Sequence, residues 1–150
     1  MSFLTKISSI IATAYPAATF LLSSKFSANL QSYAVNTAAM PLIILNNELT
    51  VDAEIKKNNN IALNRRIVIS FLNLDSVLNT DTDTEVIRDA METMAIKIAS
   101  IIWQLPEVVP SGGNQKFKIT PAFHVFNTDL SGVILEMQTN ENTISNICAI

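Results

Sequence analysis

The chain has 150 residues, of which 49% are apolar and 15% charged, and ten basic against thirteen acidic side chains give a formal net charge of -3. Because about 25% charged residues is typical of soluble domains, we expect part of the surface to contact other protein, while the acidic balance argues against DNA binding as the main function. The one cysteine, Cys148, and the one histidine, His124, exclude an internal disulfide and a cysteine-based zinc site, and they disfavour zinc hydrolases, dithiol oxidoreductases and Ser-His-Asp enzymes.

The first predicted element is an amphipathic helix over about 3–14, which Pro16 ends. Its apolar side chains recur at the three- and four-residue spacing of one helical face, namely Phe3, Leu4, Ile7, Ile10, Ile11 and Ala14. A signal peptide is the alternative, because Lys6 precedes the apolar stretch and small residues follow it. Ser8 and Ser9 interrupt that stretch, so we expect the helix to be retained in the working protein. No segment reaches the ~20 apolar residues that span a bilayer, and the protein is expected to be soluble with no membrane partner.

The next segment, 17–39, fits neither the helical nor the strand period and is compatible with one strand or two. Residues 42–45 are apolar at every position, as in a strand that is buried on both faces, and Asn46 with Asn47 favours a bend after them. From Leu49 to Ile55, apolar and polar residues alternate, which predicts a half-buried strand.

A second alternating strand over 66–72 follows, with Ile67, Ile69 and Phe71 on one face. Between the two strands, five polar residues without an apolar side chain predict a solvated hairpin tip: Lys56, Lys57, Asn58, Asn59 and Asn60. This tip is the candidate interaction loop.

Four of the ten basic residues lie in this hairpin: Lys56, Lys57, Arg65 and Arg66. One interpretation is a solvated turn that keeps a sheet edge soluble. The other is a loop directed toward DNA or an acidic neighbour in an assembly, where attraction to phosphate needs no recognition of base sequence.

A long helix is predicted over about 84–105. Thr82 with Glu85 fits a capping box at its start, Arg88 can pair with Glu92, and Pro106 ends it. Its predicted apolar face consists of Val86, Ala90, Met91, Met94, Ala95, Ile98, Ile102 and Leu105.

The same region carries carboxylates at positions 1, 3, 5 and 12 of a calcium-binding loop: Asp81, Asp83, Glu85 and Glu92. The sixth position of such a loop requires glycine and is Val86 here, so a capped helix start is the better interpretation. His124 has no metal ligand at a suitable spacing, and Ser111–Asn114 lack the order of elements that a phosphate-binding loop requires. No metal site, cofactor or catalytic residue is therefore expected.

Two further strands are predicted near the C-terminus, one from Phe117 to Val125 and one from Gly132 to Met137, separated by turn residues 127–129. The order of elements predicts one α+β domain over 1–150, an antiparallel sheet with both helices packed on one face.

Several strings also resemble small virion proteins of tailed bacteriophages: VDAEIKKNNN at 51–60, IVISFL at 67–72, FKITP at 117–121 and DLSGVIL at 129–135. The resemblance covers about 40–148, and the order of elements is similar to that of tail-terminator proteins. It implies a structural, non-enzymatic virion protein that forms a ring, hexameric in the terminators, at the tail end or head-tail junction. Its implied partners are copies of itself, neighbouring neck and tail-tube proteins, and DNA that passes through the channel. Neck adaptors, stoppers and terminators share these properties, so the resemblance does not choose among them.

Two alternatives stay open. One is a bacterial host α+β domain that binds a ligand or acts as an enzyme, which a deep pocket with convergent polar groups would favour. The other is a small secreted domain, which requires that the first ~18 residues be a signal peptide.

Overall fold

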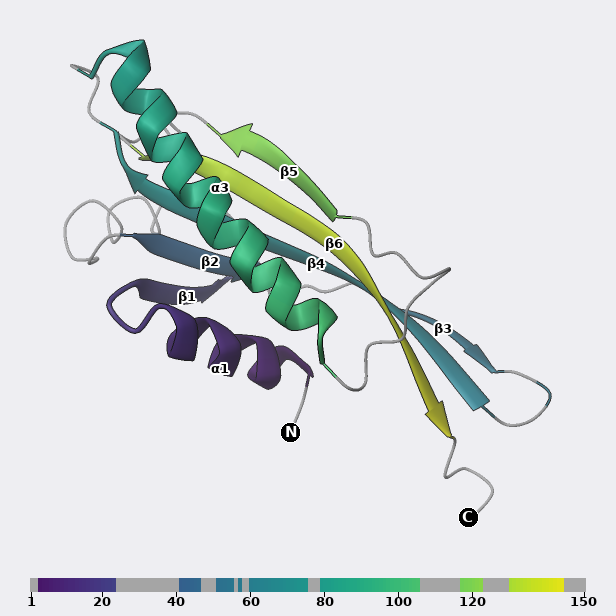
Figure 1. Ribbon diagram of the computed structural model, residues 1–150. Helices are drawn as coiled ribbons and strands as arrows, with labels where there is room; N and C mark the ends of the chain where they lie inside the picture. The colour runs from purple at the N-terminus through teal and green to yellow at the C-terminus, as the bar shows by residue number, and fades with distance from the viewer. Residues whose placement is uncertain are drawn as a thin grey trace.

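The computed structural model describes residues 3–23, 41–46, 51–55, 57, 60–75, 79–105, 117–122 and 130–144. They form an α+β fold with a six-stranded sheet and two helices, which confirms the predicted fold class (Figure 1). In chain order the elements are α1 Phe3–Ala14, β1 Thr19–Ser23, β2 Leu42–Asn46, β3 Val51–Ile55, β4 Asn60–Leu74, α3 Asp81–Trp103, β5 Phe117–Ala122 and β6 Leu130–Ile144.

The sheet is built around two long central strands. The strand order is β1-β2-β4-β6-β5, and β3 pairs with β4 beside this path. The β4–β6 ladder runs without a break from Asn60↔Ile144 to Leu74↔Leu130. Four of the five pairings between described strands are antiparallel, as predicted, whereas β1 and β2 are parallel. That parallel pair involves the segment 17–39, where the sequence shows no clear period.

Both helices pack on the same face of the sheet, as predicted (Figure 1). The alternation of β4 turns Ile67, Ile69 and Phe71 toward the helices. With them the core contains Phe3, Ile7, Ile11, Ile43, Leu45, Met91, Ala95, Ile98, Ala99, Ile102, Val133, Leu135 and Met137. The α1 bounds match the sequence prediction, because its apolar stripe covers one face and Pro16 follows it.

The opposite face of the sheet is also buried around β2. Leu42 and Ile44 point away from the helices and are 0% and 2% exposed. Leu72 and Leu130 lie on the same face and are 1% and 0% exposed. The run 42–45 is therefore buried on both faces, which is why it is apolar at every position.

The start of α3 differs from the prediction. The helix begins at Asp81, three residues before the expected start, and its N-cap is Thr80. The Thr80 hydroxyl accepts from the Asp83 amide at 3.3 Å, and the Asp83 carboxylate accepts from the Thr80 amide at 3.0 Å. Aspartate thus completes the capping box in place of the expected pair, Thr82 with Glu85.

The buried face of α3 agrees with the predicted one at Met91, Met94, Ala95, Ile98, Ile102 and Leu105, which lie in the core or pack against it, and differs from it near the start of the helix. Val86 is 63% exposed and Ala90 is exposed, so both were wrongly placed in the core. Ile87 and Ala99 pack there instead. One residue along a helix is a rotation of about 100°, so in the first turns of α3 Ile87 faces the core while its neighbour Val86 faces away from it.

The central strands are longer than predicted. β4 starts six residues before 66, and β6 continues from Met137 to Ile144. Residues 138–143 are all polar, so they lack the alternation that predicts a strand. Their backbones nevertheless pair with β4. Residues 123–129, which include His124 and the predicted turn, lie outside the described residues, as do Ser111–Asn114 and Cys148.

Candidate interaction surface

A three-stranded arm projects from the helix-covered body of the molecule. It consists of β3, residues 60–66 of β4 and residues 138–144 of β6, and Figure 1 shows it extending beyond both helices. β3 pairs with β4 from Val51↔Arg65 to Ile55↔Ile61. The continuous ladders make the arm an extension of the same sheet, held by backbone hydrogen bonds.

The apolar residues of β3 are uncovered, contrary to the predicted half-buried strand. All five residues of β3 are exposed, with Val51 at 40% and Ile55 at 68%. By strand alternation Val51, Ala53 and Ile55 share one face, which we call the apolar stripe. They pair with Arg65, Leu63 and Ile61, which lie on the same face of β4 as the core residue Ile67. The stripe therefore continues the helix-covered face of the sheet past the end of the helices, where nothing among the described residues buries it.

The root of the arm is held by α1. The Arg65 guanidinium lies 5.1 Å from the centre of the Phe3 ring, a cation–π arrangement. Thr139 pairs with Arg65 across the β4–β6 ladder and is 0% exposed. Among the described residues, its hydroxyl oxygen has no hydrogen-bond partner.

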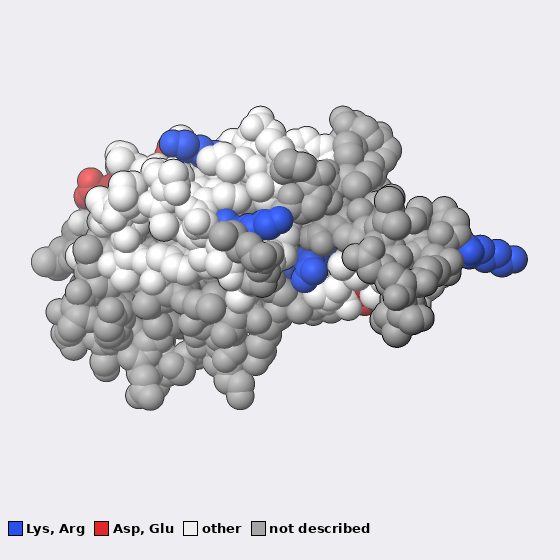
Figure 2. Space-filling model, turned by 90° about the horizontal axis from the view of Figure 1, so that it is seen from below, with Lys and Arg blue, Asp and Glu red and all other residues white. Residues whose placement is uncertain are grey.

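Two of the four basic residues of the hairpin, Arg65 and Arg66, lie on opposite faces of the sheet. Arg65 contacts Phe3 on the helix side, while Arg66 lies on the other face and pairs with Glu136 at 3.3 Å. Lys57 is exposed in the turn, and Asn60 begins β4 opposite Ile144. The remaining residues of the candidate loop, Lys56, Asn58 and Asn59, lie outside the described residues. Figure 2 shows a basic side chain at the far end of the arm and further basic side chains over the body.

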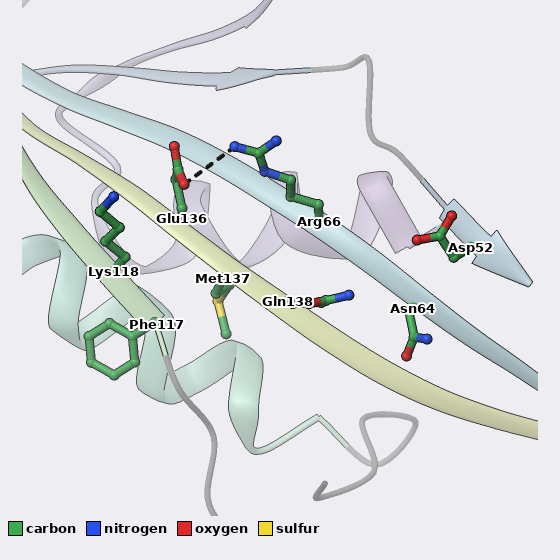
Figure 3. A pocket seen from close by; sticks show the side chains of 8 residues that line it. All are labelled: Asp52, Asn64, Arg66, Phe117, Lys118, Glu136, Met137 and Gln138. Atoms are coloured by element: carbon green, nitrogen blue, oxygen red, sulfur yellow. Dashed lines mark ion pairs between the residues drawn. The ribbon is translucent and has the colours of Figure 1, made fainter.

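An open depression of about 410 Å³ lies at the arm root, and six of its eight described lining residues lie on the sheet face turned away from the helices. Its lining comes from β3, β4, β5 and β6 (Figure 3): Asp52, Asn64, Arg66, Phe117, Lys118, Glu136, Met137 and Gln138. Arg66 forms an ion pair with Glu136, Lys118 lies directly opposite Glu136 across the β5–β6 ladder, and Asp52 lies opposite Asn64 across the β3–β4 ladder. Among the described residues, this lining has two positive and two negative side chains, which makes the depression polar with balanced charge.

Three of the four carboxylates of the rejected calcium pattern have other partners: Asp83 completes the capping box of α3, and Glu85 and Glu92 pair with Arg88. Arg88 binds Glu85 at 2.7 Å, Asp89 at 2.9 Å and Glu92 at 3.1 Å, and the last pair was predicted. Hydrogen bonding to Arg88 holds the pKa of Glu85 below its ordinary value. Within the described ranges, no three His, Cys, Asp or Glu side chains are grouped so as to hold a metal ion. Neither described helix is long and apolar enough to cross a membrane.

Neither the exposure of the stripe nor the polar depression was predicted from the sequence. The sequence offers one signal for the exposure of the stripe, which is that the strand leads directly into a tip of five polar residues at 56–60. The depression has no such signal, because its residues come together only when β5 and β6 pair.

A comparison with models of known protein families finds no match to this chain, and a comparison with curated protein sequences finds none either.

Proposed function

We propose that the protein is a structural subunit of a tailed-bacteriophage virion, which forms a ring at the tail end or the head-tail junction, joins tail to capsid and lets DNA pass. The observation that carries the proposal is the projecting arm with its exposed apolar stripe. Val51 and Ile55 are exposed on an extension of the sheet. Adjacent exposed apolar side chains are typical of a surface that another protein covers.

Two features of the sequence support the same conclusion. The charge content of 15% is low for a domain that is surrounded by water. The strings at 51–60, 67–72, 117–121 and 129–135 resemble small phage virion proteins, whose rings pack many copies of one subunit.

The first test is the composition of purified phage particles. Mass spectrometry is expected to detect the protein in particles, and electron microscopy is expected to place a ring of it, with six copies if it resembles the terminators, at the tail end or neck. Its absence from purified particles would reject the proposal. A host α+β domain that binds a ligand or acts as an enzyme and a small secreted domain would then remain as candidates.

A further inference from the structure

Two strands at opposite edges of the sheet each have one neighbour among the described strands. β3 pairs with β4 and β5 pairs with β6, so each leaves one side of its backbone unpaired within the described part of the chain. Such an edge can pair with a strand of another molecule. β4 and β6 lie between the two edges, so the edges cannot meet within one chain; Figure 1 shows β5 along the body and β3 in the arm.

The directions of the strands allow the two edges to pair between copies. From β3 through β4 and β6 to β5, each strand is antiparallel to the one before it. A strand that continues this alternation beside β5 runs in the direction of β3. A second copy can therefore place its β3 beside β5 with the helices of both copies on the same side of the sheet, and the alternation of ladder hydrogen bonds continues in phase.

The side chains of the two edges match on the helix-covered face. There β3 presents the apolar stripe, and β5 presents the residues that lie opposite the core residues of β6, which are Phe117, Ile119 and Pro121. Ile119 packs against the core, whereas Phe117 is 43% exposed and Ile55 is 68% exposed. Arg65 on this face of β4 contacts Phe3, and these three residues of β5 carry no charge that opposes it.

The charges on the other face have opposite signs. Asp52 and Glu54 are exposed on β3, and their cross-strand neighbours on β4 are uncharged. Lys118 is exposed on β5, and the carboxylate beside it, Glu136, pairs with Arg66. Within the described part of the chain, no ion pair involves Asp52, Glu54 or Lys118. Pairing β3 with another β3 opposes carboxylates to carboxylates, whereas β5 offers them a cation.

We propose that β3 of one copy pairs with β5 of the next copy and continues its sheet. In the antiparallel register that uses all of β3, the facing pairs are Ile55 with Phe117, Glu54 with Lys118, Ala53 with Ile119, Asp52 with Thr120 and Val51 with Pro121. The stripe, which the helices of its own chain do not reach, then extends the helix-covered face of the neighbour. Pro121 lacks an N–H group, as is common in edge strands, and lies at the end of the contact.

The contact is heterologous, and repeated around an axis it closes a ring or extends as a filament. It places the arm of one copy along the body of the next. The inference deepens the proposed function, because it names the surfaces by which the copies meet, and it rests on that function for the expectation that they close a ring.

Disulfide cross-linking of the full chain tests the register. Within one chain, Glu54 and Lys118 are separated by three strand spacings of about 4.8 Å each, which is beyond the reach of a disulfide. Glu54→Cys with Lys118→Cys, on a Cys148→Ser background, is expected to give a ladder of linked copies on oxidation. The matched control, Ala53→Cys with Lys118→Cys, directs the two cysteines to opposite faces and is expected to give at least about tenfold less linked product.

Charge reversal tests the pair that faces away from the helices. Glu54→Lys and Lys118→Glu each place like charges opposite one another and are expected to weaken self-association, measured by analytical ultracentrifugation, by about fivefold. The variant that carries both substitutions restores the attraction and is expected to associate like the natural protein. Because each substitution is present in it, this variant is the control for effects on folding.

Three results overturn the inference. The first is linked product no more abundant than in the control at protein concentrations up to about 1 mM. The second is a double charge reversal that associates no better than the single ones. The third is a dimer of Lys118→Cys alone that is as abundant as the ladder, since it indicates that β5 pairs with a second β5. The virion proposal is judged separately: a ladder from a protein that purified particles lack supports the strand pairing and rejects the virion.

Discussion

The Thr84 hydroxyl lies 3.1 and 3.0 Å from the two carboxylate oxygens of Asp75, and it joins the end of β4 to the first turn of α3. Asp75 is 0% exposed, and the Asn79 side-chain amide also donates to it at 2.9 Å. A buried carboxylate needs such donors, because taking a charge out of water is costly. These contacts orient α3 on the sheet.

Removing the hydroxyl is therefore expected to destabilise the fold. We expect Thr84→Val to lower the free energy of unfolding by about 1.5 to 3 kcal/mol, the range for hydrogen bonds to charged groups. Thr82→Val is the control, since Thr82 is exposed in the same helical turn. Urea denaturation measures both, and an equal effect of the two substitutions would contradict a specific role for Thr84.

The buried hydroxyl of Thr139 leads to a prediction in the opposite direction, because removing it is expected to stabilise the fold. Thr139→Val keeps the side-chain shape and removes a polar atom that is buried without a partner among the described residues, so we expect a gain of roughly 1 kcal/mol. Thr120→Val, at an exposed position on β5, is the control and is expected to change stability by no more than about 0.5 kcal/mol. Thermal unfolding of the three proteins measures this, and a less stable Thr139→Val variant would count against it.

Gly132 allows β6 to approach β4 closely. A Cβ atom at this position would overlap the carbonyl oxygen of Phe71 and lie 2.9 Å from its carbonyl carbon. Both atoms belong to the backbone of a central strand, which has little freedom to move. We expect Gly132→Ala to destabilise the protein by about 3 kcal/mol or more, through overpacking. Circular dichroism with urea gives the measurement, and an unchanged midpoint would show that the strands can separate without cost.

The contact between Arg88 and Glu85 predicts that the carboxyl group of Glu85 has a lowered pKa in the folded protein. Because Arg88 hydrogen bonds to it, the carboxyl pKa lies below 4.5 in the folded protein. The folded state therefore binds this proton more weakly than the unfolded state, so the stabilisation is present above pH 4.5 and is lost as the pH falls through the folded pKa. Carboxyl carbon NMR is expected to show the Glu85 midpoint rising toward 4.5 in Arg88→Gln. A midpoint that does not move would contradict the contact.

The hairpin tip yields a prediction that depends on the proposed function. Replacing both Lys56 and Lys57 with glutamate is expected to impair head-tail joining or DNA passage more than folding, because Lys57 is exposed in the turn. Infectivity and the fraction of joined particles measure the first effect, and thermal unfolding of the purified variant measures the second. Normal infectivity at normal stability would remove the tip from the candidate contacts.

The sequence by itself determined the elements whose packing follows a local period. Phe3, Ile7 and Ile11 recur along one helical face, and Ile67, Ile69 and Phe71 alternate along one strand face, so both elements were predicted with the side that they bury. Leu42 and Ile44 likewise reveal burial on both sides of β2. In each case the residues that report the environment lie within a few positions of one another.

Only the tertiary structure decided which surfaces stay uncovered. Val51 and Ile55 alternate just as Ile67 and Ile69 do, but the helices end before they reach β3, so the same pattern is buried in the body and exposed in the arm. The contact between Asp75 and Thr84 joins the end of β4 to the first turn of α3. The Arg66–Glu136 pair joins β4 to β6, which are far apart in the sequence. A local pattern states which side of a strand is apolar, whereas the element that covers this side is set by the packing of distant segments.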